Sequence, residues 1–309
     1  MGLRTDFIWM DGTLMPWDQA NVHVLTHALH YGFAVFEGIR AYECVDGSSA
    51  VFRLKEHTER LFGSAKALGL VIPFSPDQIN AAIVETLVAN KMPAGYIRPI
   101  VFAGSGGSMG VNPAGNPIRV AIATWPWGAY LGAEALEKGI RIRTSSYTRH
   151  HVNVMMTKAK AAGNYVNSVL AKTEALADGY DEALLLDPTG YVAEGSGENV
   201  FIVRKGVIKT PPLTSILGGI TRDSVITLAR ELGYDVVEQL FTRDEMYMAD
   251  EAFFTGTAAE LTPIRELDRR VIGEGHAGPV AKALQAAFFR VVKGEDSAHA
   301  DWLAGYSLK

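Results

Sequence analysis

Two lysines near the middle of the chain have surroundings that could support covalent chemistry. Lys158 and Lys160 lie among small residues, close to Tyr165, and neither has an adjacent carboxylate. A lysine that is shielded from water and lacks such a partner has a lowered pKa and can condense with a carbonyl group. Solvated surface lysines are more common, and in a strand both side chains would lie on the same face. The residue pattern therefore indicates a candidate nucleophile and leaves the choice between the two lysines open.

Two glycine-containing segments could bind anions through backbone N–H groups. Gly218 and Gly219 lead directly into an amphipathic stretch, where Thr221 adds a hydroxyl. A helix that starts there exposes N–H groups and the positive end of its dipole to a phosphate, although an ordinary threonine N-cap explains the same residues. Residues 253–260, which we expect to form a corner from strand to helix, are a second place where an anion could reach backbone amides. Two such places predict a ligand with two acidic groups.

The glycine-rich loop at residues 104–110 follows an expected strand and suggests a dinucleotide-binding turn. Its spacing argues against that interpretation, because Met109 stands where the fingerprint needs its third glycine. We expect this loop to cover a substrate instead.

The histidines form two clusters, one at His23, His27 and His30 and one at His150 and His151. The first three would share one face of a helix, but a zinc-binding HExxH motif needs glutamate directly after its first histidine. The second cluster has no nearby ligand partner. We interpret all five as structural and expect no metal site.

Composition narrows the class of protein. The chain has 309 residues, enough for about two domains, and its 48% hydrophobic and 20% charged residues are typical of globular proteins. A net charge of −5 with scattered basic residues argues against nucleic acid. No uncharged stretch is long enough to span a membrane, and the single cysteine, Cys44, fits a reducing compartment. We expect a soluble, cytoplasmic protein that binds small molecules.

The local patterns predict mixed strands and helices without a regular βαβ alternation, which favours an α+β fold. Expected helices lie at residues 56–70, 76–91, 165–177, 222–232 and 279–292. Expected strands lie at residues 7–10, 38–43, 51–54, 96–103, 119–125, 140–146, 182–187, 191–194, 199–203 and 207–210.

Each of these signals is weak evidence by itself, and so is Glu194, a carboxylate between glycine turns. Together, however, they occur along the chain in an order that can be recognised. The chain resembles the fold-type IV pyridoxal-phosphate enzymes, and among them the branched-chain amino acid aminotransferases. The resemblance covers nearly the whole chain and rests on motifs at residues 31–40, 96–99, 127–130, 160–165, 194–199, 219–223 and 256–260.

This resemblance implies a two-domain architecture. A small, α/β sandwich-like N-terminal domain would occupy residues 1–125, an interdomain loop residues 126–134, and a larger cofactor-binding domain with a pseudo-barrel sheet residues 135–309. A homodimer would be the minimal active unit, and a trimer of such dimers would form a hexamer.

The resemblance also implies a role for each matching residue. Lys160 would hold pyridoxal 5'-phosphate covalently and act as the base and acid, Glu194 would pair with the pyridinium nitrogen, and Tyr165 would bond to the ring oxygen. The phosphate would be held by Arg60, Ile220, Thr221 and Thr257. The substrate would be bound by Tyr31, Phe36, Tyr96, Arg98, Met109, Val111, Trp127, Tyr130, Thr257 and Ala258.

The implied reaction is that of a branched-chain-amino-acid transaminase (EC 2.6.1.42). L-Leu, L-Ile or L-Val would react with 2-oxoglutarate to give branched-chain 2-oxo acids and L-glutamate by a ping-pong mechanism. This would be the last step of branched-chain amino acid biosynthesis or the first step of degradation.

Several alternatives share the same lysine and glutamate. D-amino acid transaminase, aminodeoxychorismate lyase and R-selective amine transaminase are rivals within the fold, and an inactive binding protein is an alternative of another class. Tyr31, Arg98 and the 127–130 motif favour the branched-chain enzyme.

Overall fold

The computed structural model describes residues 3–128 and 132–308 of the chain. The chain forms two compact units. The first comprises Met1–Trp127, Ala159–Gly163 and Val291–Lys309, and the second comprises Gly128–Lys158 and Asn164–Arg290.

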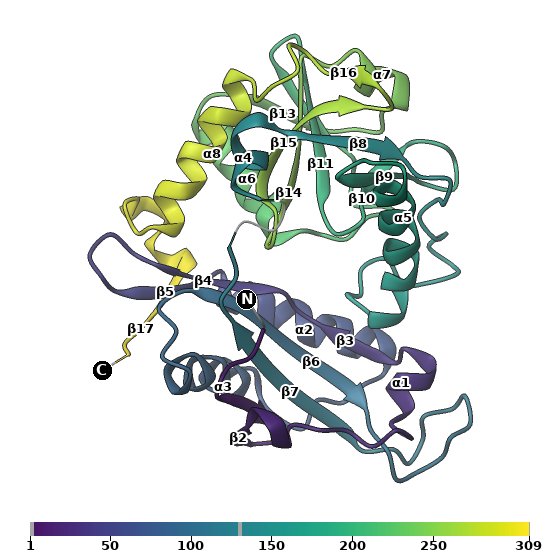
Figure 1. Ribbon diagram of the computed structural model, residues 1–309, viewed down its shortest axis with the longest axis vertical. Helices are drawn as coiled ribbons and strands as arrows, with labels where there is room; N and C mark the ends of the chain where they lie inside the picture. Colours follow the sequence, from purple (N-terminus) through teal and green to yellow (C-terminus); the bar gives the residue numbers. More distant parts are fainter. Residues whose placement is uncertain (1–2, 129–131, 309) are drawn as a thin grey trace. The chain divides into compact units, whose positions relative to one another are not determined.

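The first unit is built on an antiparallel sheet whose two longest helices, Leu54–Leu68 and Pro76–Ala89, pack on one face (Figure 1). Over the described residues its strand order is β17-β5-β4-β6-β7-β1-β2, with β3 beside β6. The elements are β1 (Phe7–Met10), β2 (Thr13–Pro16), η1 (Trp17–Gln19), α1 (His27–Tyr31), β3 (Ala34–Phe36), β4 (Ile39–Glu43), β5 (Ser49–Phe52), α2 (Leu54–Leu68), α3 (Pro76–Ala89), β6 (Gly95–Ala103), β7 (Ile118–Trp125), η3 (Ser297–Trp302) and β17 (Leu303–Tyr306).

Alternation along β6 separates the two faces of this sheet. Ile97 and Val101 are completely buried in the core with Ile83 of α3, whereas Arg98, on the opposite face, remains partly exposed. Helix α3 begins with a capping box in which Ser75 accepts from the Gln78 backbone N–H. The apolar face therefore packs on α2 and α3, and the other face is available for polar and aromatic side chains.

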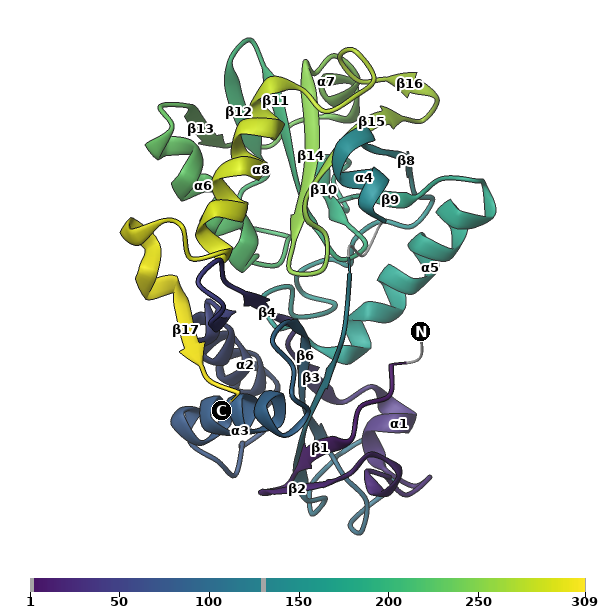
Figure 2. The ribbon, with the colours of Figure 1, turned by 60° about the vertical axis from the view of Figure 1, so that its left-hand side comes forward.

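The second unit contains a mixed sheet in the order β10-β9-β8-β15-β14-β11-β12-β13 (Figure 2). An additional pairing of β10 with β11, through Glu194 and Asn199, joins β8, β9, β10, β11, β14 and β15 into a closed ring. The elements are α4 (Ala133–Lys138), β8 (Ile140–Thr144), η2 (Ala162–Asn164), α5 (Tyr165–Ala177), β9 (Glu182–Leu186), β10 (Val192–Gly195), β11 (Asn199–Arg204), β12 (Val207–Thr210), α6 (Ile220–Glu231), β13 (Asp235–Glu238), α7 (Arg243–Tyr247), β14 (Glu251–Gly256), β15 (Glu260–Leu267), β16 (Arg270–Val271) and α8 (Pro279–Val292). Two residues of η2 and the last two of α8 belong to the first unit.

These two sheets and their helices confirm the α+β class and the barrel-like sheet of the larger domain. The compact units differ from the predicted division in two segments that the sequence places within residues 135–309. Residues 303–306 form β17, which pairs with β5, and Ala161 bridges to Val35. Such pairing joins residues far apart in the chain and leaves no periodic signal near either partner.

Two local expectations, and the alternative in which Thr221 caps its helix, were wrong. Residues 253–260 form an antiparallel hairpin between β14 and β15 rather than a corner into a helix. Glu260, the first residue of β15 after this turn, has a positive φ of 54°. Helix α1 begins at His27, so His23 does not share its face. Helix α6 has Gly219 as its N-cap, which places Thr221 inside the first turn and not at the cap.

Candidate active site

Lys160 lies in the first unit, on a backbone segment held from both sides. Its carbonyl accepts a hydrogen bond from the Phe36 N–H at 3.0 Å, and its own N–H donates to Ser64 Oγ at 3.0 Å. The Nζ atom lies 5.0 Å from the centroid of the Phe36 ring. Strand β3 and helix α2 thus fix the base of this side chain.

Lys158 has different surroundings, although the sequence pattern could not separate the two lysines. It belongs to the second unit, and its Nζ donates to the carbonyl of Ile216 at 2.9 Å. Burial lowers the pKa of Lys158. This side chain secures the segment that leads to Gly218 and Gly219, which gives it a local structural task.

A buried ion cluster surrounds Arg60, the predicted phosphate ligand. Its Nε and Nη2 donate to the two oxygens of Glu37, each at 2.7 Å, and His57 Nδ1 lies 2.8 Å from Glu37 Oε2. Burial opposes ionisation of Glu37, but the charge of Arg60 and hydrogen bonds from Arg60 and His57 outweigh it and lower its pKa to about 2. Burial also lowers the pKa of His57. Neither Glu37 nor His57 was among the predicted site residues.

Aromatic rings surround Arg98 on the other face of the first sheet. Its Cζ lies 4.7, 5.3 and 5.8 Å from the ring centroids of Phe36, Tyr96 and Trp125. Tyr96 pairs with Trp125 across β6 and β7, so their side chains share the face of Arg98, and the Trp127 ring lies 4.5 Å from that of Tyr96. Arg98 Nε is buried without a hydrogen-bond partner among the described residues. A guanidinium held this way can bind a carboxylate.

The glycine-rich loop folds against α1 within the first unit. Tyr31 Oη donates to the Met109 carbonyl at 2.8 Å, and His27 Nε2 lies 3.0 Å from the Gly110 carbonyl. Val111 is strongly exposed. Tyr31 and Met109, both predicted to bind substrate, are therefore in direct contact within one chain.

Glu194 lies in the second unit with both carboxylate oxygens bonded. Oε1 accepts from Arg149 Nε at 2.9 Å, and Oε2 accepts from the Leu217 N–H at 3.2 Å and from Asn199 Nδ2 at 3.3 Å. The residue is buried at the point where β10 meets β11. A carboxylate fixed in this way presents a negative charge in one direction.

Arg149, which the sequence analysis did not single out, connects Glu194 to helix α5. Its Nη1 donates to Asn167 Oδ1 at 2.9 Å and to Ser168 Oγ at 3.0 Å. Both partners lie in the first turn of the helix that Tyr165 begins. No motif marks Arg149, because its partners lie in other parts of the chain.

The predicted phosphate site begins helix α6. Its N-cap, Gly219, brings no capping side chain, and Ile220 and Thr221 are buried in its first turn. A Cβ on Gly219 would overlap Asn199 Oδ1, so this position requires glycine. Thr257 and Ala258 form the β14–β15 turn, beside Thr255, whose buried Oγ1 has no hydrogen-bond partner among the described residues.

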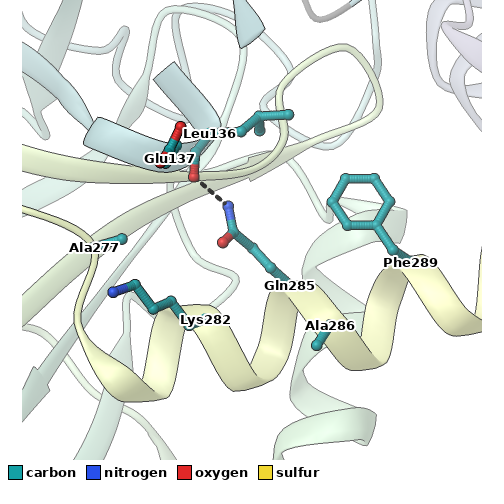
Figure 3. Close-up of a pocket in the computed structure, with 7 residues that line it drawn as sticks. All are labelled: Leu136, Glu137, Ala277, Lys282, Gln285, Ala286 and Phe289. Atoms are coloured by element: carbon teal, nitrogen blue, oxygen red, sulfur yellow. Dashed lines mark hydrogen bonds between the residues drawn. The ribbon is translucent and has the colours of Figure 1, made fainter. Parts of the chain in front are cut away.

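A separate cavity of about 370 Å³ lies between α4 and α8 (Figure 3). Gln285 crosses it and donates to the Leu136 carbonyl at 2.9 Å. None of the predicted site residues that the structure describes lines this cavity. In the described ranges, no three His, Cys, Asp or Glu side chains could hold a metal ion, and no helix there is both long and apolar enough to cross a membrane.

The chain matches a known family over residues 34–267, that of the amino-transferases of class IV. This chain belongs to the class IV aminotransferases. The branched-chain-amino-acid aminotransferase of Pseudomonas aeruginosa is 56% identical over 302 residues, 98% of each chain. The solved structure of a T.th. branched-chain amino acid aminotransferase with pyridoxamine 5'-phosphate aligns over all of both chains, with a TM-score of 0.95 and 52% identity. Another T.th. structure, complexed with N-(5'-phosphopyridoxyl)-L-glutamate, aligns equally far at a TM-score of 0.93 and 49% identity.

These likenesses confirm the resemblance predicted from the motifs and the prediction that the chain is a branched-chain-amino-acid aminotransferase. In this class IV aminotransferase the predicted residues fall into two sets. The first unit carries Tyr31, Phe36, Arg60, Tyr96, Arg98, Met109, Val111, Trp127 and Lys160, and the second carries Tyr165, Glu194, Ile220, Thr221, Thr257 and Ala258. Tyr130 lies outside the described residues.

Proposed function

We propose that this aminotransferase uses pyridoxal 5'-phosphate to exchange amino groups between L-Leu, L-Ile or L-Val and 2-oxoglutarate. The products are branched-chain 2-oxo acids and L-glutamate, and the two half-reactions alternate in a ping-pong mechanism. The T.th. complex with N-(5'-phosphopyridoxyl)-L-glutamate supports glutamate as one of the amino acids. The enzyme completes branched-chain amino acid synthesis or begins their degradation, in the cytoplasm.

The buried Glu194 carboxylate is the observation that carries this proposal. Burying a carboxylate costs several kcal/mol unless it is paired, and here Arg149 and two N–H donors orient it. A fixed negative charge of this kind suits a protonated pyridinium nitrogen. The start of α6, whose N-cap is a glycine, suits a phosphate, so the residues of the second unit fit both charged ends of the cofactor.

The chain's own residues then perform the steps around the cofactor. When bound, pyridoxal phosphate accepts the amino group and stabilises negative charge at the substrate Cα. Lys160 supplies the amine that holds it and that moves a proton at the substrate Cα. Glu194 keeps the pyridinium nitrogen protonated, and Tyr165 bonds to the ring oxygen. The phosphate is bound by Arg60, Ile220, Thr221 and Thr257.

The substrate residues serve two needs. Phe36, Tyr31, Trp127, Tyr130 and Tyr165 supply apolar walls, and such walls distinguish one methylene by only ~1–3 kcal/mol, so all three branched-chain amino acids are used. Arg98, whose buried Nε lacks a partner among the described residues, donates to the second carboxylate of glutamate. The α-carboxylate is bound by Tyr96 and the backbone of Thr257 and Ala258.

We propose a homodimer as the active unit, with Met109 and Val111 reaching the site of the neighbouring subunit. Large apolar side chains are exposed in the second unit, which favours a protein partner over water. They lie just before Lys158 and along α5: Val152, Val154, Met155, Met156, Val166, Val169 and Leu170. Sedimentation equilibrium distinguishes this dimer from a hexamer of three dimers.

Substitution of each lysine tests the mechanism. Lys160→Ala is expected to abolish both the visible absorbance of bound cofactor and transamination. Lys158→Ala is expected to keep both, with a lower melting temperature because the bond to Ile216 is lost. The reverse result would show that Lys158, and not Lys160, is the reactive lysine.

A panel of amino donors tests the substrate class. We expect faster reaction with L-Leu than with D-Ala or R-phenylethylamine. Preference for D-Ala or for the amine would favour the D-amino acid or R-amine enzymes of the same fold instead.

A further inference from the structure

Glu37 is a buried charged residue to which the proposed reaction gives no role. It follows Phe36 directly, between β3 and β4, and its side chain is completely buried. Taking an ionised carboxylate out of water is costly, and only close partners offset the cost. Glu37 is therefore a costly buried charge directly beside Phe36, a residue assigned to the site.

The contacts of Glu37 define the orientation of the Arg60 guanidinium. The two 2.7 Å hydrogen bonds use Arg60 Nε and Nη2, so the carboxylate grips one side of the planar fork. His57 bonds to Oε2 of the same carboxylate at 2.8 Å. An ionised carboxylate only accepts hydrogen bonds, so the His57 proton must be on Nδ1. His57 thereby helps to hold Glu37 through Oε2, the oxygen that also accepts from Arg60 Nη2.

One face of α2 carries the cluster and also supports Lys160. His57, Arg60 and Ser64 are three and four residues apart, which places them along one side of the helix. Ser64 Oγ accepts the backbone N–H of Lys160. The same helix face therefore positions the guanidinium and the backbone of the proposed cofactor lysine, and all of these residues belong to the first unit.

We propose that Glu37, held by His57, is a positioning residue that turns the Nη1 side of the Arg60 guanidinium toward the phosphate of the cofactor. Because the guanidinium donors lie in one plane, fixing Nε and Nη2 also fixes the direction in which Nη1 donates. This inference rests on the proposed role of Arg60 as a phosphate ligand. It assigns Glu37 an effect on phosphate binding that a purely structural ion cluster would not have.

Comparison of two cofactor forms tests this assignment. Full-length enzyme freed of cofactor is titrated with pyridoxal 5'-phosphate and with pyridoxal, which lacks the phosphate. Glu37→Gln is expected to weaken pyridoxal phosphate binding by about tenfold or more, as expected for a lost hydrogen bond to a charged group, and to change pyridoxal binding less than about twofold. Equal weakening of both ligands would overturn the proposal, because it would indicate general damage to the fold.

A double variant and a matched control sharpen the result. Arg60→Gln should show the same selectivity for the phosphate, and Glu37→Gln combined with Arg60→Gln should bind no more weakly than Arg60→Gln alone. Additive losses would separate the two residues and refute the positioning role. Glu56→Gln breaks a comparable pair with Arg53 on the same helix and should leave both affinities unchanged.

A milder variant keeps the test decisive where Glu37→Gln fails to fold. His57→Gln keeps the arginine pair and removes the imidazole that holds Oε2, so a smaller loss confined to pyridoxal phosphate is expected. No selective loss would refute the role of His57 and Glu37. A wild-type chain that binds neither form would refute the proposed function instead.

Discussion

Glu198 provides a measurable pH dependence of stability. It is buried in the second unit immediately before β11. Burial, reinforced by the charge of Glu182, raises the pKa of Glu198 to about 8 from 4.5. Between these values the folded chain keeps a proton that the unfolded chain has lost, so the free energy of unfolding falls as pH rises. Glu198→Gln, which replaces the neutral acid with an amide of the same shape, is expected to remove this loss.

The size of the effect follows from the two pKa values. They differ by about 3.5 pH units, which at ~1.4 kcal/mol per unit limits the total to roughly 5 kcal/mol. About 3 kcal/mol of this falls between about pH 6 and pH 9. Water that enters around the ionised carboxylate reduces the amount, so we expect Glu198→Gln to gain at least ~1 kcal/mol over the wild type across this interval.

Thermal unfolding of wild type and variant at several pH values measures the difference. A gain of 1 kcal/mol corresponds to roughly 1–2 °C in a chain of this length, so the two melting temperatures should diverge by a few degrees as pH rises. Glu59→Gln, at an exposed glutamate of α2, is the control and should follow the wild type. A difference between Glu198→Gln and wild type that stays constant from about pH 6 to pH 9 would refute the reasoning.

Three further variants test the proposed site. Arg149→Met leaves a buried carboxylate without its cation, which typically costs about 3–5 kcal/mol; thermal unfolding should show the loss, and an unchanged melting temperature would contradict it. Gly219→Ala would make a Cβ overlap Asn199 Oδ1 and should weaken pyridoxal phosphate binding about tenfold or more. Gly218→Ala is the control, because its Cβ would meet Leu213 at 4.0 Å, an ordinary contact distance, and its affinity should not change. Equal affinities of the two variants for pyridoxal phosphate would exclude a steric requirement for glycine at position 219. Arg98→Ala should reduce turnover with 2-oxoglutarate more than with 2-oxoisocaproate, and equal losses would remove Arg98 from the second-carboxylate role.

Secondary structure was predicted well from the sequence where the signal lies in neighbouring residues. Helices such as α3 and α5 show periodic apolar residues or recognisable starts, and the structure places them at nearly the predicted residues. The anion sites depended on glycines and small residues within a few positions of each other. The prediction failed at residues 253–260, because the small residues of a hairpin turn resemble those of a helix start when no partner strand is visible.

The sequence alone determined the family, the two-sheet α+β class and the candidate residues, because short motifs preserve their spacing along the chain. The tertiary structure decided which charges meet. Arg149 and Glu194 are separated by 45 residues and Glu37 and Arg60 by 23, so only strand pairing and helix packing bring each pair together. Burial then sets the electrostatics of these groups, since the same carboxylate in water would need no partner.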